Sequence, residues 1–387
     1  MNEKRLLQRL RNTEHLLDNY QENEPFSRFL SRFFKENRQM GSSDRRAATE
    51  LSYHLFRLGN AAATRPRRER MAMAEFLCAP EGDWLPLLQP EWMSSAVLSL
   101  DNRIAFLEEQ TDFRLSDVFP LHQELSPAID EPAFIRSHFV QPRLFIRMHT
   151  GKEKTVTTLL REAGISYETM TGQTLALDNG APLDQVKKLK GLYEVQDLSS
   201  QQTASFFRAR PGESWWDACA ASGGKSILLK QTSPAVSLLV SDIRQSILRN
   251  LDERFESAGI RDYRHKIIDL TSDPSVILGD EQFDGIILDA PCTGSGTWGR
   301  TPEMLSRFGA QGIARYVLLQ QQMAAHAVRH LKPGCPLIYI TCSVFQAENE
   351  RTLAFLEQLG LRTEQAAYLQ GYTDRADTLF AARMIKV

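Results

Sequence analysis

Two short apolar runs, each followed by a cysteine, constrain this chain most. Residues 285–288 lead into Asp289-Ala-Pro-Cys292, and residues 336–340 lead into Thr341-Cys342. Short runs that are apolar at every position are typical of strands buried on both faces of a parallel sheet. The carboxyl ends of parallel strands open on the crevice where such sheets bind ligands. We therefore expect both sulfurs to lie over one pocket.

The pattern around these runs predicts a doubly wound parallel sheet. From residue 213 the chain repeats strand, loop and helix, which is the order of elements in such a sheet. Predicted strands cover residues 214–219, 236–240, 266–268, 285–288 and 336–340. A helix is expected over 303–331, and a final helix precedes a terminal strand near 379–385.

The turn after the first of these strands has the composition of a ligand-binding loop. It consists of Cys219, Ala220, Ala221, Ser222, Gly223, Gly224 and Lys225. Small residues let the backbone approach a ligand closely, and the helix that follows offers free N–H groups. The turn lacks the leading glycine of a GxxxxGK[ST] phosphate-binding loop.

Three aspartates follow strands of the predicted sheet. Asp242 comes 19 residues after Gly223, the distance at which an acid accepts hydrogen bonds from a ribose diol. Asp269 and Asp289 follow two further strands. One strand-end aspartate alone also fits a helix cap. All three beside a glycine-rich first turn predict a ligand that contains adenosine.

Residues 1–125 are expected to be helical. Phe26, Phe29, Leu30, Phe33 and Phe34 recur at the spacing of an amphipathic helix, and core packing explains them better than base stacking. Another apolar stripe ends before Gly59, which is placed as a helix cap. The arginines after it are expected to be exposed, either in a solvated loop or against phosphate: Arg65, Arg67, Arg68 and Arg70.

Composition shifts to serine, proline and acid around 125–132, which indicates a domain boundary. A strand over 143–148 and a helix over 152–163 then predict a small α/β module. Arg143 and Arg147 lie on one face of that strand, where they meet either RNA backbone or solvent. The predicted domains are 1–125, 126–212 and 213–387.

Overall composition indicates an ordinary globular protein, with 42% hydrophobic and 24% charged residues. No apolar run approaches the roughly 20 residues of a membrane span, and the charged N-terminus does not resemble a signal peptide. The five cysteines form no CxxC pair, so neither a metal site nor a disulfide framework is expected. We therefore expect a cytoplasmic protein with reduced thiols and no membrane partner.

Net charge is −2 overall, but it is unevenly distributed. Residues 1–70 carry 15 Lys/Arg against 9 Asp/Glu, whereas residues 71–140 carry 3 against 12. A basic segment beside an acidic one fits either a phosphate-facing surface or solvated helix faces.

These motifs, in this order, resemble the Nop/Sun family of RNA (cytosine-5) methyltransferases. The resemblance rests on Cys219-Ala-Ala-Ser-Gly-Gly-Lys225, Asp289-Ala-Pro-Cys292 and Thr341-Cys342-Ser343 with Glu348-Asn-Glu350. It covers about residues 130–387. Over 1–125 it is weaker, although residues 41–46 are similar to the NusB-like helical domain of the bacterial Sun small-subunit rRNA methyltransferases.

The resemblance implies a fold and a set of site residues. The fold is a Rossmann-like doubly wound methyltransferase sheet, preceded by a small α/β module and an all-helical NusB-like domain. The cofactor is S-adenosylmethionine, held by residues 219–225 with Asp242 at the ribose, Asp269 near the adenine and Asp289 between cofactor and base. Cys342 is the implied nucleophile, and Cys292 is the implied product-releasing cysteine.

The chemistry of cytosine explains why two thiols are useful. C5 of cytosine is a poor nucleophile, but addition of a thiolate to C6 makes C5 reactive. A second thiol can then help to remove the C5 proton. A nearby cation such as Lys225 favours the thiolate, and Asp289, when protonated or bridged to N3, can take up charge that develops on the ring. The target base must be unpaired or flipped out of its helix.

The expected partner is RNA, with ribosomal RNA preferred and transfer RNA as the alternative. A non-catalytic RNA-binding assembly factor that keeps the fold is a second alternative. A protein or small-molecule methyltransferase would have no use for paired thiols. Two positions stay open: Ser222 stands where the family has proline, and Trp298 either stacks on a base or packs on the loop.

Overall fold

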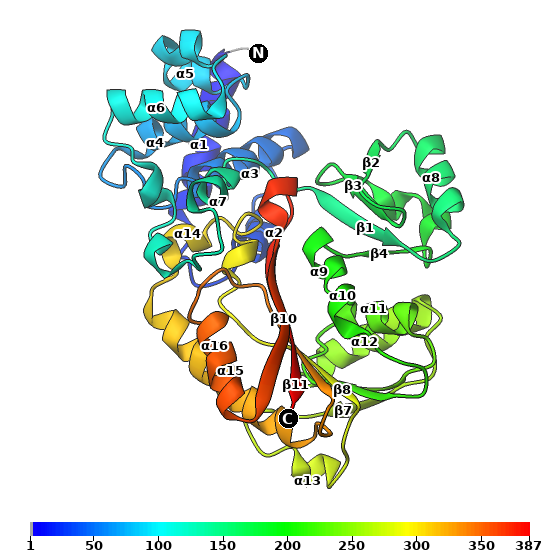
Figure 1. Cartoon of the computed structure of the whole chain (residues 1–387). Coiled ribbons are helices and arrows are strands. Elements are labelled where there is room, and N and C mark those ends of the chain that lie inside the picture. Colours follow the sequence, from blue (N-terminus) through cyan, green and yellow to red (C-terminus); the bar gives the residue numbers. More distant parts are fainter. Residues whose placement is uncertain (1–2) are drawn as a thin grey trace. The chain divides into compact units, whose positions relative to one another are not determined.

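The computed structural model describes residues 3–387, and contacts within the chain define two units (Figure 1). The first unit consists of residues up to 123 together with 130–141 and 298–309. The second consists of 124–129, 142–297 and 310–387. The expected helical domain began at residue 1, and its first two residues lie outside the described part. The predicted three-domain division stays a prediction.

The first unit is helical, as expected from the apolar stripes. Its helices are α1 (Glu3–Asp18), α2 (Phe26–Glu36), α3 (Ser42–Phe56), α4 (Arg67–Cys78), α5 (Leu85–Leu88), α6 (Leu100–Gln110), α7 (Glu131–Ser137) and α14 (Met304–Arg307). Phe26, Phe29, Leu30 and Phe33 of α2 are buried in one cluster, so the stripe belongs to the core. Trp298 is also buried and lies against Phe119 and Phe308, so it packs on the protein.

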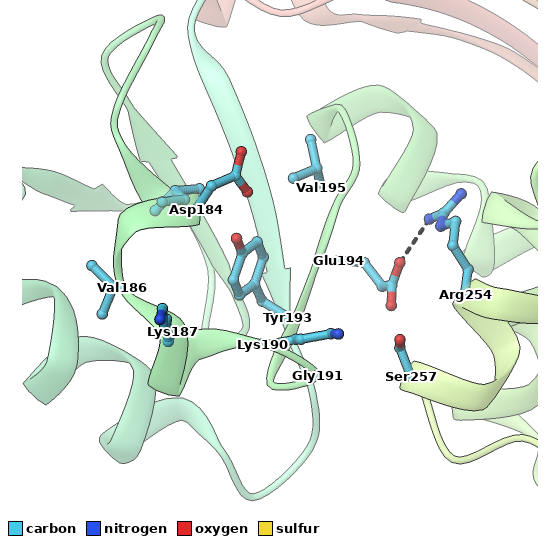
Figure 2. Close-up of a pocket in the computed structure, with 11 residues that line it drawn as sticks. Asp184, Val186, Lys187, Lys190, Gly191, Tyr193, Glu194, Val195, Arg254 and Ser257 are labelled. Carbon is cyan, nitrogen blue, oxygen red and sulfur yellow. Dashed lines mark hydrogen bonds and ion pairs between the residues drawn. The ribbon is translucent and has the colours of Figure 1, made fainter. Parts of the chain in front are cut away.

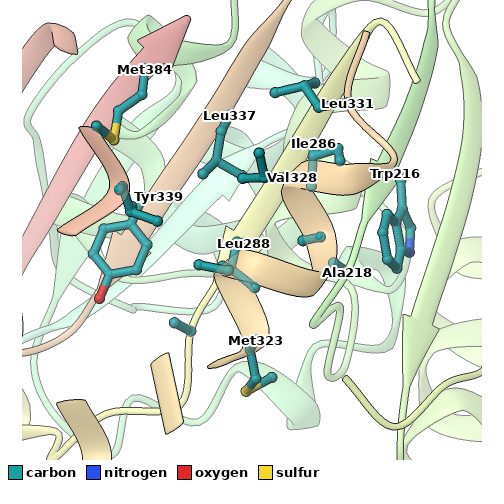
Figure 3. Packing of buried hydrophobic residues seen from close by; sticks show 14 of the residues in the cluster. Trp216, Ala218, Ile286, Leu288, Met323, Val328, Leu331, Leu337, Tyr339 and Met384 are labelled. Atoms are coloured by element: carbon teal, nitrogen blue, oxygen red, sulfur yellow. The ribbon is translucent and has the colours of Figure 1, made fainter. Parts of the chain in front are cut away.

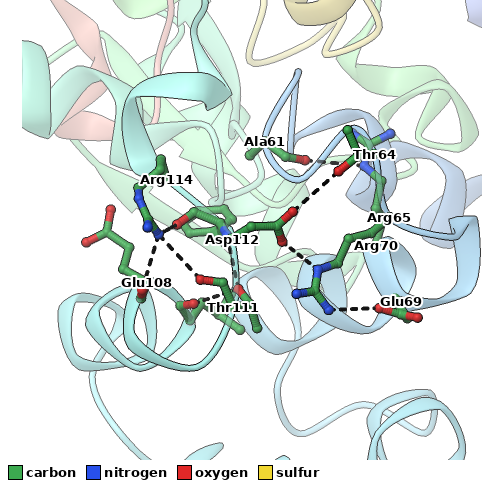
Figure 4. A network of polar contacts seen from close by, with 11 residues as sticks. Ala61, Thr64, Arg65, Glu69, Arg70, Glu108, Thr111, Asp112 and Arg114 are labelled. Carbon is green, nitrogen blue, oxygen red and sulfur yellow. Dashed lines mark hydrogen bonds and ion pairs between the residues drawn. The ribbon is translucent and has the colours of Figure 1, made fainter.

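The expected exposed loop of arginines is largely helical. Arg67, Arg68 and Arg70 lie in the first turn of α4, because Pro66 can precede a helix without losing a hydrogen bond. Arg70 donates to the carbonyls of Gly59 and Ala61, and its neighbourhood is a network of polar contacts (Figure 4). Arg67 and Arg68 form ion pairs with Asp18 and Glu14.

The second unit begins with a four-stranded antiparallel sheet of order β2-β3-β1-β4. Its strands are β1 (Leu144–Met148), β2 (Tyr167–Thr169), β3 (Thr174–Leu177) and β4 (Tyr193–Val195), accompanied by α8 (Glu153–Glu162). The helices α9 (Leu198–Gln202) and α10 (Ala204–Phe207) follow it. The expectation for Arg147 was wrong: its side chain is buried and donates to Gln196 and Gln231, so it meets neither solvent nor RNA.

The main sheet has seven strands in the order β10-β11-β9-β8-β5-β6-β7. They are β5 (Ser214–Asp217), β6 (Ser237–Asp242), β7 (Arg264–Ile267), β8 (Gly285–Asp289), β9 (Pro336–Thr341), β10 (Leu361–Gln370) and β11 (Thr378–Lys386). Strands β5 to β9 pair in parallel, and β10 and β11 add an antiparallel edge. The predicted doubly wound α/β sheet is therefore confirmed.

Side chains of the central strands alternate between two cores, as the pleat requires. Ile286, Leu288 and Leu337 pack with α15 (Gln311–Arg329) and α16 (Glu350–Gln358) on one face (Figure 3). Ile287 and Ile338 pack on the other face with α11 (Gly224–Thr232) and α12 (Gln245–Ser257). Burial on both faces explains why these strands are apolar at every position.

The structure differs from the predicted elements at two places. The helix expected over 303–331 is divided, because Phe308 and Gly309 separate α14 from α15. Strand β10 was not predicted: its sequence is rich in polar residues, which suits an edge strand exposed along one side. The short α13 (Ser275–Leu278) completes the described helices of the sheet unit, and none of the helices in residues 3–387 is long and apolar enough to cross a membrane.

Candidate active site

The two cysteines lie together at the carboxyl ends of neighbouring strands. Strands β8 and β9 pair in parallel, with Asp289 opposite Ile340. Cys292 follows the first strand and Cys342 the second, and their Sγ atoms are 3.2 Å apart. Both cysteines are half-buried, so neither is sealed inside the protein. The expectation that the two sulfurs lie together agrees with this geometry, and their role in a shared site stays a prediction.

The two thiols have different electrostatic surroundings. The hydrogen bond with Cys342 and burial together raise the pKa of the Cys292 thiol well above its ordinary value, and the nearby Glu348 adds to the effect. Lys225 interacts electrostatically with Cys342. Burial alone lowers the pKa of the Lys225 amine, but Asp289 and Cys342 raise it above the ordinary value. The pair therefore contains one thiol that holds its proton, beside a lysine that stays cationic.

A buried carboxylate that the sequence analysis did not assign ties the two cysteine loops together. Glu348 accepts from the backbone N–H of Thr293 at 3.0 Å and from its hydroxyl at 2.6 Å. It also accepts from the hydroxyl of Ser343 and from Nε2 of Gln320. Thr293 and Ser343 are the residues directly after the two cysteines, so Glu348 fixes both loops at once.

Glycine permits the close approach of these loops. The backbone N–H of Gly296 donates to the Cys342 carbonyl at 2.9 Å. A Cβ atom at position 296 would lie 2.0 Å from the Thr378 carbonyl oxygen, far inside van der Waals contact. The predicted glycine-rich loop therefore packs against the ends of β9 and β11, where only a residue without a side chain fits.

The predicted cofactor turn joins β5 to α11. The backbone is left-handed at Ala221 (φ 46°) and at Gly223 (φ 85°), which bends the chain sharply between strand and helix. A Cβ at Gly223 would lie 2.7 Å from the Phe255 ring of α12. Ala220 and Cys219 are largely enclosed, and burial raises the pKa of the Cys219 thiol well above its ordinary value. Cys219 is thus a small packed side chain of this turn.

Lys225 links the cofactor turn to the cysteine loop. Its Nζ donates to Oδ2 of Asp289 at 2.9 Å, and its side chain is only 11% exposed. The same ammonium interacts electrostatically with Cys342. Two of the predicted catalytic residues therefore form one ion pair beside the two sulfurs.

Asp242 and Asp269 lie at the ends of β6 and β7. The Asp242 carboxylate accepts from the backbone N–H of Ala221 at 3.2 Å and from the exposed Arg244 through both of its oxygens. Asp269 accepts from the backbone and the hydroxyl of Thr271. Asp242 thus contacts the predicted cofactor turn, whereas Asp269 closes a local turn.

Sequence reasoning missed a second buried acid near the site. Asp217 ends β5 directly before the turn and is fully buried. Burial and the charge of Asp289 raise its pKa to about 7, although a hydrogen bond from Ser226 (2.6 Å) opposes the shift. Its place at a strand end was a usable signal. Glu348 was quoted only as part of a motif, and its sequence neighbours did not show that it joins two loops.

The residues present fit S-adenosylmethionine. The turn is built from small residues that leave its backbone accessible, and carboxylates at Asp242 and Asp289 offer acceptors for hydroxyl and amine donors. A ribose diol at Asp242 would displace Arg244, whose side chain is 58% exposed. The guanidinium that would have to move is thus mostly in solvent, although Asp242 itself is buried.

Comparison with known proteins finds similarity to methyltransferases. Residues 204–371 match the family model described as 16S rRNA methyltransferase RsmB/F. The ribosomal RNA small subunit methyltransferase B of Xylella fastidiosa is 33% identical over 217 residues, 55% of this chain and 50% of that protein. The protein of the same name from Citrobacter koseri is 28% identical over 66% of this chain and 62% of its own length. The chain spans about half the length of the first of these relatives.

Solved structures share the fold. The structure of PH0851 covers 94% of this chain with a TM-score of 0.70 and 21% identity. The structure of NSun6 from Pyrococcus horikoshii with SFG covers 69% of this chain and 97% of that chain, with a TM-score of 0.61 and 16% identity. The resemblance stated from the motifs is therefore confirmed for residues 204–371 by the family model, and these structures support the fold.

Proposed function

We propose that this chain is an S-adenosylmethionine-dependent RNA cytosine-5 methyltransferase that acts on small-subunit ribosomal RNA. The observation that carries the proposal is the 3.2 Å separation of the Cys292 and Cys342 sulfurs beside Lys225 and Asp289. The names of the curated relatives favour ribosomal RNA over transfer RNA as the substrate.

Cys342 is the nucleophile of this proposal. Its thiolate adds to C6 of cytosine, and the electrons move to C5. Lys225 stays cationic and lies close enough to stabilise the negative sulfur. The neighbouring Cys292 holds its proton and is placed to donate it to that sulfur, which also stabilises the thiolate.

When bound, S-adenosylmethionine supplies a methyl group to the C5 atom made reactive by this addition. Asp289 lies beside Lys225, and in its protonated form it would donate to N3 of the ring and so take up the negative charge that develops there. The residues of the 219–225 turn, with Asp242, would hold the cofactor beside the cysteine loops, to which Lys225 links this turn.

Cys292 completes the reaction by removing the C5 proton. The electrons of the C5–H bond then re-form the ring double bond and expel the Cys342 sulfur from C6. Cys342 is the first cause of the raised pKa of Cys292. Once Cys342 is bonded to carbon it no longer carries a charge, so the pKa of Cys292 falls. The half-buried Cys292 thiol then loses its own proton to solvent, and the thiolate that remains takes the proton from C5.

The test uses two cysteine variants and measures a covalent adduct. Cys292→Ala incubated with substrate RNA and S-adenosylmethionine should give a denaturant-resistant protein–RNA adduct, because the release step is lost. Cys342→Ala should give none. Cys335→Ala, at a cysteine outside the site, is the matched control and should turn over normally.

The outcomes separate the alternatives. Exchanged behaviour of the two variants would show that the roles are reversed. If the wild-type chain transfers no labelled methyl group to any cellular RNA, a non-catalytic assembly factor is the better description. Bisulfite sequencing of RNA from a deletion strain identifies the target cytosine and decides between ribosomal and transfer RNA.

A further inference from the structure

An arginine on α12 holds the predicted cofactor turn, residues 219–225, by hydrogen bonds. Nη1 of Arg254 donates to the carbonyl oxygen and to the hydroxyl of Ser222, at 2.8 Å each. Nη2 of the same guanidinium donates to Oε2 of Glu194 at 2.6 Å. The planar fork of arginine suits such a bridge, because one rigid group can hold two partners in fixed directions.

Glu194 anchors this bridge in the four-stranded sheet. It lies in β4, only 7% exposed, and also contacts Nε2 of His149 at 3.4 Å. Burial would raise the pKa of its carboxyl, but the hydrogen bonds from His149 and Arg254 hold that pKa below its ordinary value. The ion pair is visible in Figure 2, with Arg254 opposite Glu194.

A second contact leads from the same sheet to the same turn. Gln196 lies two residues after Glu194, and its Nε2 donates to the Gly224 carbonyl at 3.3 Å. The buried Arg147 of β1 donates to Oε1 of Gln196 at 2.8 Å and so fixes the direction of the amide. The small sheet therefore reaches two successive parts of the cofactor turn, at Ser222 and at Gly224.

Ser222 is the position where the resembled family has proline. A proline ring restricts the backbone of its own residue, whereas serine leaves that backbone freer and adds a hydroxyl. In this chain the carbonyl and the hydroxyl of Ser222 are both held by one guanidinium. The Arg254 contact thus supplies by hydrogen bonds a restraint that the ring would supply covalently.

We propose that Arg254, anchored by Glu194, is a positioning residue that holds the cofactor turn in its binding conformation in place of a proline. The inference rests on the proposed function, because it assigns the turn to S-adenosylmethionine. Arg254 contacts Ser222 of the turn and Glu194, so we expect its effect to fall on cofactor affinity and not on the cysteine chemistry.

The site is well suited to substitution. Arg254 and Glu194 line a cavity of about 630 Å³, together with Tyr193, Lys190 and Ser257 among others (Figure 2). Shortening the side chain at position 254 therefore enlarges an open space and leaves no closed void. For this reason we expect Arg254 variants to fold.

The experiment measures binding of S-adenosylhomocysteine to the full chain by calorimetry, together with KM and kcat. Arg254→Met should weaken binding about 10- to 100-fold, since two hydrogen bonds to the turn are lost. KM for the cofactor should rise by a similar factor while kcat at saturation changes little. Arg249→Met, on the exposed side of the same helix, is the matched control and should bind as wild type.

Rescue distinguishes positioning from general damage. Adding Ser222→Pro to the Arg254→Met variant should restore most of the affinity, because the ring then restrains the turn. Wild-type binding by Arg254→Met, or no recovery with Ser222→Pro, would overturn the inference. If the wild-type chain itself fails to bind S-adenosylhomocysteine, the proposed function fails instead.

Discussion

At the scale of single residues, the fold disfavours the charged form of the Asp217 carboxyl. Its carboxyl is fully buried at the end of β5, near Asp289 as well as Lys225, and its pKa is raised to about 7. Water no longer solvates the carboxylate there, and the hydrogen bond that it accepts from the Ser226 hydroxyl does not make up for that loss. The folded protein therefore holds this proton at pH values where the unfolded chain has released it.

Replacing Asp217 with asparagine should change how stability depends on pH. Because the folded-state pKa lies above the unfolded value of 3.8, this carboxyl makes the wild type less stable as pH rises from about 4 to 7, by up to about 4 kcal/mol. Asparagine cannot ionise, so Asp217→Asn should gain thermal stability relative to wild type between pH 5 and pH 8. The midpoint temperature of unfolding measures this difference.

Asp269→Asn serves as the control, since that half-buried side chain closes a turn at the same edge of the sheet. An offset between Asp217→Asn and wild type that stays constant with pH would contradict the expectation.

At the scale of elements, the active site depends on two loops that follow β8 and β9. Neither loop is regular, and both are aligned by hydrogen bonds to Glu348, which precedes α16. A buried carboxylate that accepts from several donors holds them firmly in place. The donors are no longer hydrated in the folded protein, so leaving the carboxylate would cost each of them its hydrogen bond. The 3.2 Å contact between the sulfurs therefore depends on a third segment of the chain.

Glu348→Gln should loosen both loops while leaving the sheet intact. The amide keeps the shape of the carboxylate but loses its charge and half of its acceptors, at a cost of about 1–3 kcal/mol. We expect a lower unfolding temperature and a lower yield of the Cys292→Ala adduct, with binding of S-adenosylhomocysteine preserved. Glu357→Gln, at an exposed position of α16, should leave all three measurements unchanged.

At the scale of the whole molecule, net charge says less than the pairing of charges. The formal net charge is −2, and the arginines of the basic first 70 residues include Arg67 and Arg68, which pair with Asp18 and Glu14. By contrast, the exposed Lys187 and Lys190 beside the cavity of Figure 2 have no ion-pair partner within residues 3–387. A cation without a carboxylate partner gains more from a phosphate.

We therefore expect the two clusters to differ in RNA binding. Lys187→Gln with Lys190→Gln should weaken binding of single-stranded RNA and reduce the slope of log affinity against log salt by about 1.4, which corresponds to two phosphate contacts. Arg67→Gln with Arg68→Gln should change that slope less, because phosphate must first displace a carboxylate. Titrations between 50 and 200 mM salt compare the two double variants. If both change the slope equally, ion pairing within the protein does not determine which cations contact RNA.

Much of the fold could be predicted from local patterns. The apolar runs that became β8 and β9, the stripe of α2 and the small residues before α11 each depend on neighbours within a few positions. Strand β10 was missed because an exposed edge strand has no apolar signature, and the break between α14 and α15 because helical periodicity continues past Gly309. The candidate cysteines were identified by their place after strands and by flanking motifs.

Local patterns were enough to say which residue types follow each strand, because alternation and turn chemistry act over a few neighbouring positions. Which of these residues meet depends on the folded chain. Parallel pairing of two strands brings together sulfurs that are 50 positions apart. The buried Asp217 and Glu348 and the half-buried Arg254 take partners from other elements. Such contacts depend on register and packing, which no local pattern encodes.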